Sequence, residues 1–421
     1  MPHIKLPYGK SLVEIDVPKD NLVGILTGKH APGQTIERAF EHAWKNPIGI
    51  ENPAKLIKPG ERVVFVVTDH TRSTPTQEIF SLLWECIHTN VRSDDVVLIV
   101  ATGTHRPPTK EELQAMFGNL LDRFRVEVHD CDKDLLQVGT SRRGTPILVN
   151  RHVAEADRVV TIGHIGMHYY AGYSGGRKNI LPGVAGRETI EKNHAQLTDP
   201  GCEGCVYQGN PISEEMSEAA RMVGVDFIVD CVLDGQGEVG RVVIGDLEEA
   251  HAVGRAFWDS LFRVTVPERA DLVVVSAGGH PKDIDLYQSY KALYNAGKAV
   301  KRGGIILLVA ACPDGAGNDV FADWAMRSKH PRDVFDIFAR EGFKLGGHKA
   351  LYLAKDLQRA EIYLLSEGNR SCVERFFLEP VSSPAEVLNA ARKRFGKDYR
   401  VLVMPHGAET FPIIGSPVFE E

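Results

Sequence analysis

The chain has 421 residues, which is long enough for two or three domains, each with its own hydrophobic core. Hydrophobic residues make up 43% and charged residues 25%, a balance typical of globular proteins in water. The net charge is −7 and no basic run is present, which argues against nucleic acid as the main partner. No apolar run approaches the ~20 residues of a membrane span, so we expect a cytoplasmic protein without a membrane partner.

The first half of the chain alternates predicted strands and helices. Residues 1–25 alternate apolar and polar side chains, which predicts a small antiparallel layer. Continuous apolar runs at 61–69 and 94–105 end in polar residues, as parallel strands buried on both faces do. Further strands are predicted at 124–130, 147–153 and 157–166, and helices at 35–46, 75–89 and 109–117. This alternation predicts an α/β sheet whose ligands bind at the carboxyl ends of the strands.

A second α/β unit is predicted to begin near residue 267. Its strands are expected at 268–281, 302–312 and 361–367, and its helices at 331–341 and 384–395. A last apolar run, at 399–407, predicts one more strand. The chain contains neither a repeat of solenoid length nor a low-complexity segment, which favours compact domains.

Polar residues follow the two apolar runs at 61–69 and 94–105. Asp69 and Arg72 lie in TDHTR, and His105 lies in TGTH. Histidine titrates near neutrality, so His105 can act as a base or an acid, and an arginine can hold a carboxylate through two hydrogen bonds. The structural alternatives are a histidine that caps the next helix and an ion pair between Asp69 and Arg72 that only orders the loop.

The segment 164–194 combines histidines, glycines and a basic pair. Gly175 and Gly176 precede Arg177 and Lys178, so the backbone can approach an anion while the basic pair supplies charge. A lysine in such a loop can also be a nucleophile if it is desolvated or lies beside another cation. Because no Walker or Rossmann spacing is present, the residues alone fit a surface phosphate loop with scattered histidines equally well.

Together these motifs resemble the nickel-pincer lactate racemase family of 2-hydroxyacid racemases and epimerases. The matching motifs are HYYAGYSGGRKNILPG with His194 after it, TDHTRSTP, ATGTHRPPT, GNP, DLYQSYK and GGHKA. They occur in the order and at separations similar to those of the family, so the resemblance spans most of the chain.

The resemblance implies two α/β domains with the active site in the interdomain cleft. Residues 1–266, joined by 401–421, would bind the cofactor, and residues 267–400 would close over the substrate. The implied activity is racemisation or epimerisation of a 2-hydroxy acid, lactate-like or larger, by removal of a hydride and its return to either face. The implied cofactor is a nickel-pincer nucleotide, pyridinium-3-thioamide-5-thiocarboxylic acid mononucleotide, attached to Lys178 and holding Ni(II). Loading it would require cofactor-biosynthesis proteins as partners.

The same resemblance implies a role for each candidate residue. His105 and His168 would be the catalytic acid/base pair, and His194 would be the nickel ligand. Besides Lys178, the cofactor-binding residues would be Asp69, Gly175, Gly176 and Arg177. The substrate-binding residues would be Arg72, Tyr287, Gln288 and Lys291, of which the first and last are expected to bind the substrate carboxylate from opposite domains. No role follows for His164.

Two other hypotheses stay open. The chain could be an epimerase of a sugar acid that uses the same residues, or a non-catalytic nickel- or nucleotide-binding protein. A plain NAD dehydrogenase would need GxGxxG after the first strand, which is absent. Cys202 and Cys205 form a lone CxxC, a weak zinc or redox signal without a second pair. His348 and Lys349 in GGHKA could line the site.

Overall fold

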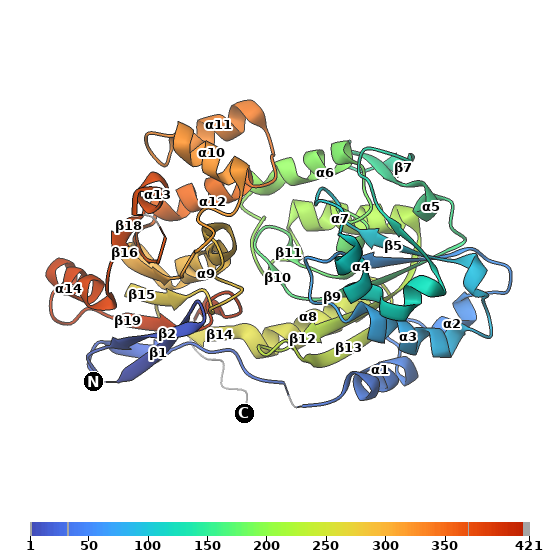
Figure 1. Ribbon diagram of the computed structural model, residues 1–421, viewed down its shortest axis with the longest axis horizontal. Coiled ribbons are helices and arrows are strands. Elements are labelled where there is room, and N and C mark those ends of the chain that lie inside the picture. Colours follow the sequence, from blue (N-terminus) through green and yellow to red (C-terminus); the bar gives the residue numbers. More distant parts are fainter. Residues whose placement is uncertain (1, 32, 369, 416–421) are drawn as a thin grey trace. The chain divides into compact units, whose positions relative to one another are not determined.

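The computed structural model describes residues 2–31, 33–368 and 370–415 (Figure 1). The chain divides into two compact units: unit 1 combines residues 1–29 with 262–421, and unit 2 comprises residues 30–261. Each unit contains a six-stranded sheet with helices, so the predicted α/β class is confirmed. None of the described helices is both long and apolar enough to cross a bilayer.

The sheet of unit 2 has the order β13-β12-β9-β4-β5-β6. All neighbours are parallel except β12 and β13. Its strands are β4 (Val63–Thr68), β5 (Val96–Ala101), β6 (Arg125–Val128), β9 (Arg158–His164), β12 (Val225–Leu233) and β13 (Val239–Gly245). Two hairpins stand outside it: β7 (Leu135–Thr140) with β8 (Pro146–Asn150), and β10 (Met167–His168) with β11 (Gly172–Tyr173).

The helices of unit 2 lie in the connections between these strands. They are α1 (Ile36–Lys45), α2 (Pro53–Leu56), α3 (Thr76–Ile87), α4 (Lys110–Phe117), α5 (Arg151–Ala154), α6 (Arg187–His194), α7 (Pro211–Val223) and α8 (Glu249–Phe262), with short 3-10 turns η1 (Ser93–Asp95), η2 (Gly118–Asp122), η3 (Gly176–Asn179) and η4 (Ala195–Thr198). Phe40 of α1 and Phe80 of α3 pack with apolar side chains of the central strands in one core. These strands are Val- and Ile-rich because both of their faces are buried.

The order of the strands in unit 2 reverses between β4 and β9. The chain passes from β4 to β5 and β6 on one side, then returns to β9 and β12 on the other. In open α/β sheets the loops at the carboxyl ends of the strands diverge at such a reversal and leave room for a ligand. The loops after β4 and β9 are therefore the first place to look for a site.

The sheet of unit 1 has the order β18-β17-β16-β15-β19-β3 and is parallel throughout. Its strands are β3 (Leu22–Ile25), β15 (Ala270–Ser276), β16 (Val300–Val309), β17 (Ala360–Leu365), β18 (Glu379–Val381) and β19 (Val401–Met404). The other strands are β1 (His3–Tyr8) with β2 (Ser11–Asp16), and β14 (Arg263–Val266) with β20 (Phe411–Ile414). Its helices are α9 (Leu286–Ala299), α10 (Asp319–Arg327), α11 (Asp333–Glu341), α12 (Gly347–Leu357), α13 (Arg370–Arg375) and α14 (Pro384–Phe395).

Three predicted placements differ from the structure. Residues 1–25 and the last strand were expected in the first domain, but β3 pairs with β19 and β19 with β15, all inside unit 1. In Figure 1 the blue hairpin of β1 and β2 accordingly lies beside β15 and β19. Residues 416–421 of the predicted 401–421 segment lie outside the described residues. The predicted strand at 147–153 is shorter than expected: β8 ends at Asn150, and the residues after it form α5. An apolar run shows that a strand is buried but not which sheet it joins.

Candidate active site

Asp69 and His105 meet at the carboxyl ends of β4 and β5. Nδ1 of His105 lies 2.7 Å from Oδ2 of Asp69, and Oγ1 of Thr71 donates to Oδ1 of Asp69 at 2.6 Å. Burial opposes ionisation of Asp69, but the hydrogen bonds from His105 and Thr71 and the charge of Arg72 outweigh it and lower its pKa. A carboxylate at this distance places the imidazole proton on Nδ1, so Nε2 of His105 is the basic nitrogen.

This contact decides between the two hypotheses for Asp69. Within the described part of the chain, its side chain is hydrogen-bonded to His105 and forms no salt bridge with Arg72. The cofactor-binding role of Asp69 stays a prediction; its described side-chain contacts are with His105 and Thr71. His105 lies 36 residues away in sequence, which explains why the strand-end pattern did not reveal this contact.

Lys178 lies in η3, which is hydrogen-bonded to β4 and β9, the two strands between which the strand order reverses. Nδ2 of Asn179 donates to the carbonyl oxygens of Ile162 in β9, at 2.9 Å, and Val66 in β4, at 3.4 Å. The backbone N–H of Gly103 donates to the carbonyl oxygen of Gly183, at 2.9 Å, just after this turn. The loop that bears His105 and the loop that bears Lys178 are therefore joined directly.

The surroundings of the Lys178 amine oppose its positive charge. The residue is half-buried, and desolvation, with the nearby charges of Arg72 and Arg177, holds its pKa well below its usual range. A neutral amine is a nucleophile, whereas an ammonium is not. The structure thus brings Arg72 and Lys178, two of the predicted residues, into one electrostatic environment.

Gly175, Gly176 and Arg177 remain predicted cofactor-binding residues, and the last two have buried partners within the protein. Arg177 is 1% exposed; its guanidinium donates to Oγ of Ser213 at 2.8 Å and stacks on the ring of Tyr207 at 4.3 Å. The backbone N–H of Gly176 donates to a buried carboxylate of β12. The sequence shows where donors occur, but not which buried acceptors lie beneath them.

An aromatic cluster brings His168 and His194 together. The ring of Tyr170 is perpendicular to that of His168, at 4.4 Å between centroids, and meets the ring of His194 edge-on at 5.3 Å. The backbone N–H of Ala171 donates to Nδ1 of His168 at 3.3 Å. Arg177 donates to the carbonyl oxygen of Ala171 at 3.2 Å, which ties this cluster to η3.

Sequence reasoning missed the buried polar residues that hold these loops. Asn179 directly follows Lys178, and Asp230 interrupts the apolar run VDFIVDCVL of β12. A carboxyl group in such a run indicates a buried polar contact, because a charge is rarely buried without a partner. His164, for which no role was predicted, lies with Nδ1 3.4 Å from Oγ1 of Thr74 and links the end of β9 to the loop after β4.

The predicted substrate-binding residues of unit 1 lie on α9. Asp285 caps this helix and accepts from the backbone N–H of Gln288 at 2.6 Å. Tyr287 and Gln288 are half-buried in the first turn, and Lys291 is exposed one turn later. Nζ of Lys349 lies 3.5 Å from the centre of the Tyr287 ring and also donates to the Tyr287 carbonyl oxygen. Asp285 and Lys349 therefore bind the two polar groups of the peptide between Tyr287 and Gln288.

The remaining candidates are the histidine in GGHKA and the CxxC pair. Burial lowers the pKa of His348 to about 3, so it is neutral and belongs to the core. Among the described residues the side chains that gather like metal ligands are Asp130, Cys131 and Asp132, and Arg187 pairs with Asp132 there. The CxxC pair is not part of this group.

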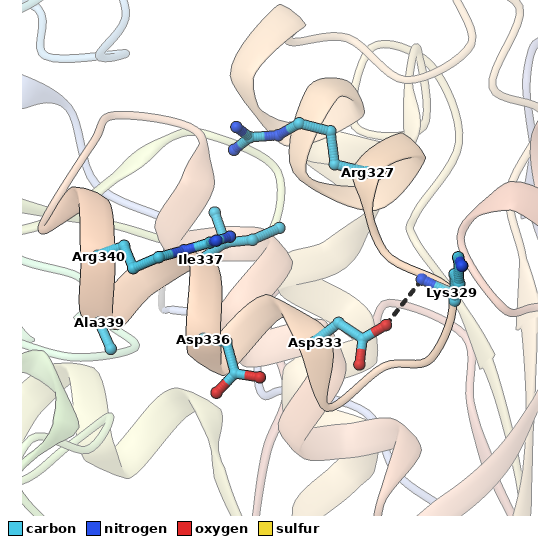
Figure 2. Close-up of a pocket in the computed structure, with 7 residues that line it drawn as sticks. All are labelled: Arg327, Lys329, Asp333, Asp336, Ile337, Ala339 and Arg340. Atoms are coloured by element: carbon cyan, nitrogen blue, oxygen red, sulfur yellow. Dashed lines mark hydrogen bonds between the residues drawn. The ribbon is translucent and has the colours of Figure 1, made fainter.

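A hollow of about 510 Å³ lies on the surface of unit 1, around α11 (Figure 2). Its lining residues are Arg327, Lys329, Asp333, Asp336, Ile337, Ala339 and Arg340. Arg327 is paired with Glu341 and Asp323, and Asp333 accepts from the backbone of Lys329. No predicted site residue lines this hollow.

Known proteins match the chain along nearly all of its length. Residues 8–203 match the lactate racemase N-terminal domain, and residues 265–411 match the lactate racemase C-terminal domain. A lactate racemase from Thermoanaerobacterium thermosaccharolyticum is 32% identical over 419 residues, with 97% of this chain and 98% of that protein covered. A lactate racemase from Lactiplantibacillus plantarum is 28% identical over 430 residues, with 96% and 98% covered.

Solved structures give the same picture. The structure of the lactate racemase apoprotein from Thermoanaerobacterium thermosaccharolyticum matches with a TM-score of 0.92 at 32% identity, covering 98% of this chain and 100% of that one. A protein from Thermotoga maritima matches with a TM-score of 0.65 at 19% identity, covering 91% and 100%. The second likeness shows the fold alone.

Proposed function

Because the chain belongs to the lactate racemase family and is an isomerase, we propose that it racemises or epimerises a 2-hydroxy acid, lactate or a larger relative. The observation that carries this proposal is the His105–Asp69 pair, joined through Gly103 and Gly183 to the loop of Lys178. A non-catalytic binding protein would not need a histidine whose basic nitrogen is set by a buried carboxylate.

The two histidines serve opposite enantiomers in this proposal. Asp69 keeps the proton on Nδ1 of His105, so Nε2 takes the hydroxyl proton of one enantiomer. Nδ1 of His168 accepts from the Ala171 N–H, so a neutral His168 carries its proton on Nε2, and we propose that it gives this proton to the substrate oxygen. Two such groups are needed because the hydroxyl proton must be exchanged on each side of the substrate carbon.

Arg72 is our proposed anchor for the substrate carboxylate. It lies close enough to Lys178 to lower its pKa, and within the described residues it forms no salt bridge. A guanidinium can bind a carboxylate through two parallel hydrogen bonds. On unit 1, we propose that Tyr287, Gln288 and Lys291 supply further donors to the substrate.

Lys178 and His194 fit the nickel-pincer nucleotide. A desolvated amine of lowered pKa can be acylated, and a buried imidazole suits Ni(II). When bound, this cofactor supplies the acceptor and donor of the hydride at the substrate carbon. The residues of the chain then bind the acid, move its hydroxyl proton and retain the 2-oxo acid.

The test is production of the chain together with cofactor-biosynthesis proteins, followed by a screen of 2-hydroxy acids for loss of optical rotation. Intact-mass measurement should show an adduct, and peptide mapping should place it on Lys178. Lys178→Ala should lose both adduct and activity, whereas Arg72→Ala should keep the adduct and lose turnover. His194→Ala should keep the organic adduct but lose most of the nickel. An adduct on another lysine, or full activity in unmodified protein, would refute the proposal.

A further inference from the structure

We infer that Asp230, in the interior of β12, is a positioning residue that fixes the backbone on which Lys178 is carried. This inference rests on the proposed function only in taking Lys178 as the anchor. Asp230 has no exposed surface, and it pairs in register with Gly163 of β9. Its Oδ2 accepts a hydrogen bond of 2.7 Å from the backbone N–H of Gly176, the first residue of η3.

Two glycines leave room for this one carboxylate. A methyl group added at Gly175 would lie 2.6 Å from Oδ2 of Asp230, and one added at Gly163 would lie 2.9 Å from Oδ1. Gly175 and Gly176 also have φ values of +81° and +50°, which favour glycine. The loop therefore passes over Asp230 in a conformation that any side chain at Gly175 would disturb.

Lys178 lies between two fixed points of this loop. On one side Gly176 is held by Asp230, and on the other Asn179 is held by the carbonyl oxygens of Ile162 and Val66. Without Asp230 the Gly176 N–H would be buried with no acceptor, and this cost is relieved if the loop opens to water. Opening would expose the Lys178 amine and remove the desolvation that lowers its pKa.

The carboxylate is not explained by the sheet alone. An apolar side chain could fill this position of β12 at a lower cost than a buried carboxyl group. Burial raises the pKa of Asp230 to about 7, against the hydrogen bond from Gly176 and the charge of Arg177. The hydrogen bond from Gly176 therefore explains the Asp230 carboxyl group, which the packing of β12 does not require.

The experiment measures the Lys178 amine directly in the protein without cofactor. Acetylation by an N-hydroxysuccinimide ester is followed by peptide mass between pH 6 and 10, and the midpoint of the labelling curve is determined. The midpoint reports the ionisation of Lys178 separately from the access of the reagent. In Asp230→Ala we expect the midpoint to rise by at least one pH unit, which lowers the neutral fraction about tenfold at neutral pH. Asp230→Asn keeps an oxygen acceptor for Gly176, so its labelling midpoint should rise by less than half as much as that of Asp230→Ala.

Asp356 provides the matched control. Desolvation raises its pKa to about 7 as well, and it accepts a hydrogen bond of 2.7 Å from Tyr290, but it belongs to unit 1. Asp356→Ala should leave the Lys178 midpoint unchanged. An unchanged midpoint in Asp230→Ala, or an equal shift in Asp356→Ala, would overturn the inference.

A second variant covers the case in which Asp230→Ala does not fold. Gly175→Ala leaves the carboxylate in place but forces the loop away from it, so it should raise the midpoint in the same direction; no rise would overturn the inference. If Lys178 proved not to be the cofactor anchor, the proposed function would fail in the adduct map, while the labelling curve would still decide the role of Asp230.

Discussion

The two units share a six-stranded plan but hold their candidate residues in different ways. In unit 2, Asp69 and Asn179 join loops that follow different strands, so His105 and Lys178 depend on several distant segments. In unit 1, Tyr287 depends on the cap of its own helix and on Lys349. Residues fixed by several buried hydrogen bonds are positioned precisely, as proton transfer requires, whereas a single helix presents donors that can adjust to a ligand. We therefore expect changes in unit 2 to abolish activity and changes in unit 1 to tune it.

The strongest test of this contrast is the loss of either histidine in unit 2. His105→Ala and His168→Ala should each keep the adduct and nickel and lose at least ~100-fold in the rate of racemisation, the usual effect of removing a general acid or base. Initial rates from both enantiomers measure this. His42→Ala, on the exposed surface of α1, is the control and should be unaffected. Near-normal rates for His168→Ala would assign its role to His164 instead.

A smaller loss is expected when His105 remains but its partner changes. In Asp69→Asn the amide no longer fixes the proton on Nδ1, so the rate should fall by roughly 10- to 100-fold, as for other residues that orient a functional histidine. Thr71→Val removes only the second hydrogen bond to Asp69 and should cost less. Nitrogen NMR of His105 would report the tautomer. If both variants kept the wild-type tautomer and rate, the positioning role of Asp69 would be wrong.

In unit 1 the expected effect is on substrate binding. Lys349→Met removes a cation that lies over the Tyr287 ring, an interaction worth roughly 1 kcal/mol, or about fivefold in KM, with kcat changed less. Lys355→Met removes a similar contact with Tyr352 on the same helix and serves as the control. A loss of kcat as large as that of His105→Ala would erase the difference between the units.

The smallest effect on activity is expected for Asp356→Asn, which should change only stability. The pKa of about 7 in the folded protein exceeds the ~3.9 of an unfolded chain. The folded state therefore holds this proton more tightly, and the carboxyl group reduces stability progressively as pH rises from about 4 to 7. The asparagine variant should lose less free energy of unfolding over that range, by on the order of 2 kcal/mol. Urea unfolding at pH 5 and 7.5 measures it; identical pH dependence in both proteins would contradict the assignment.

The sequence alone determined the α/β class and the strand ends that bear functional side chains. Apolar runs and the polar residues that end them are local features, so they can be recognised without the fold. The motifs around Lys178 and His105 also identified the family, because several matches in one order are far more specific than any single motif.

Only the tertiary structure decided which partners these residues meet. The N-terminal strand and the strand at 401–404 join unit 1, since strand pairing depends on neighbours hundreds of residues away. Gly176 donates to Asp230, 54 residues later, a contact that its glycine-rich surroundings did not predict. A buried donor must be satisfied wherever the fold supplies an acceptor, and that acceptor is not visible in the local sequence.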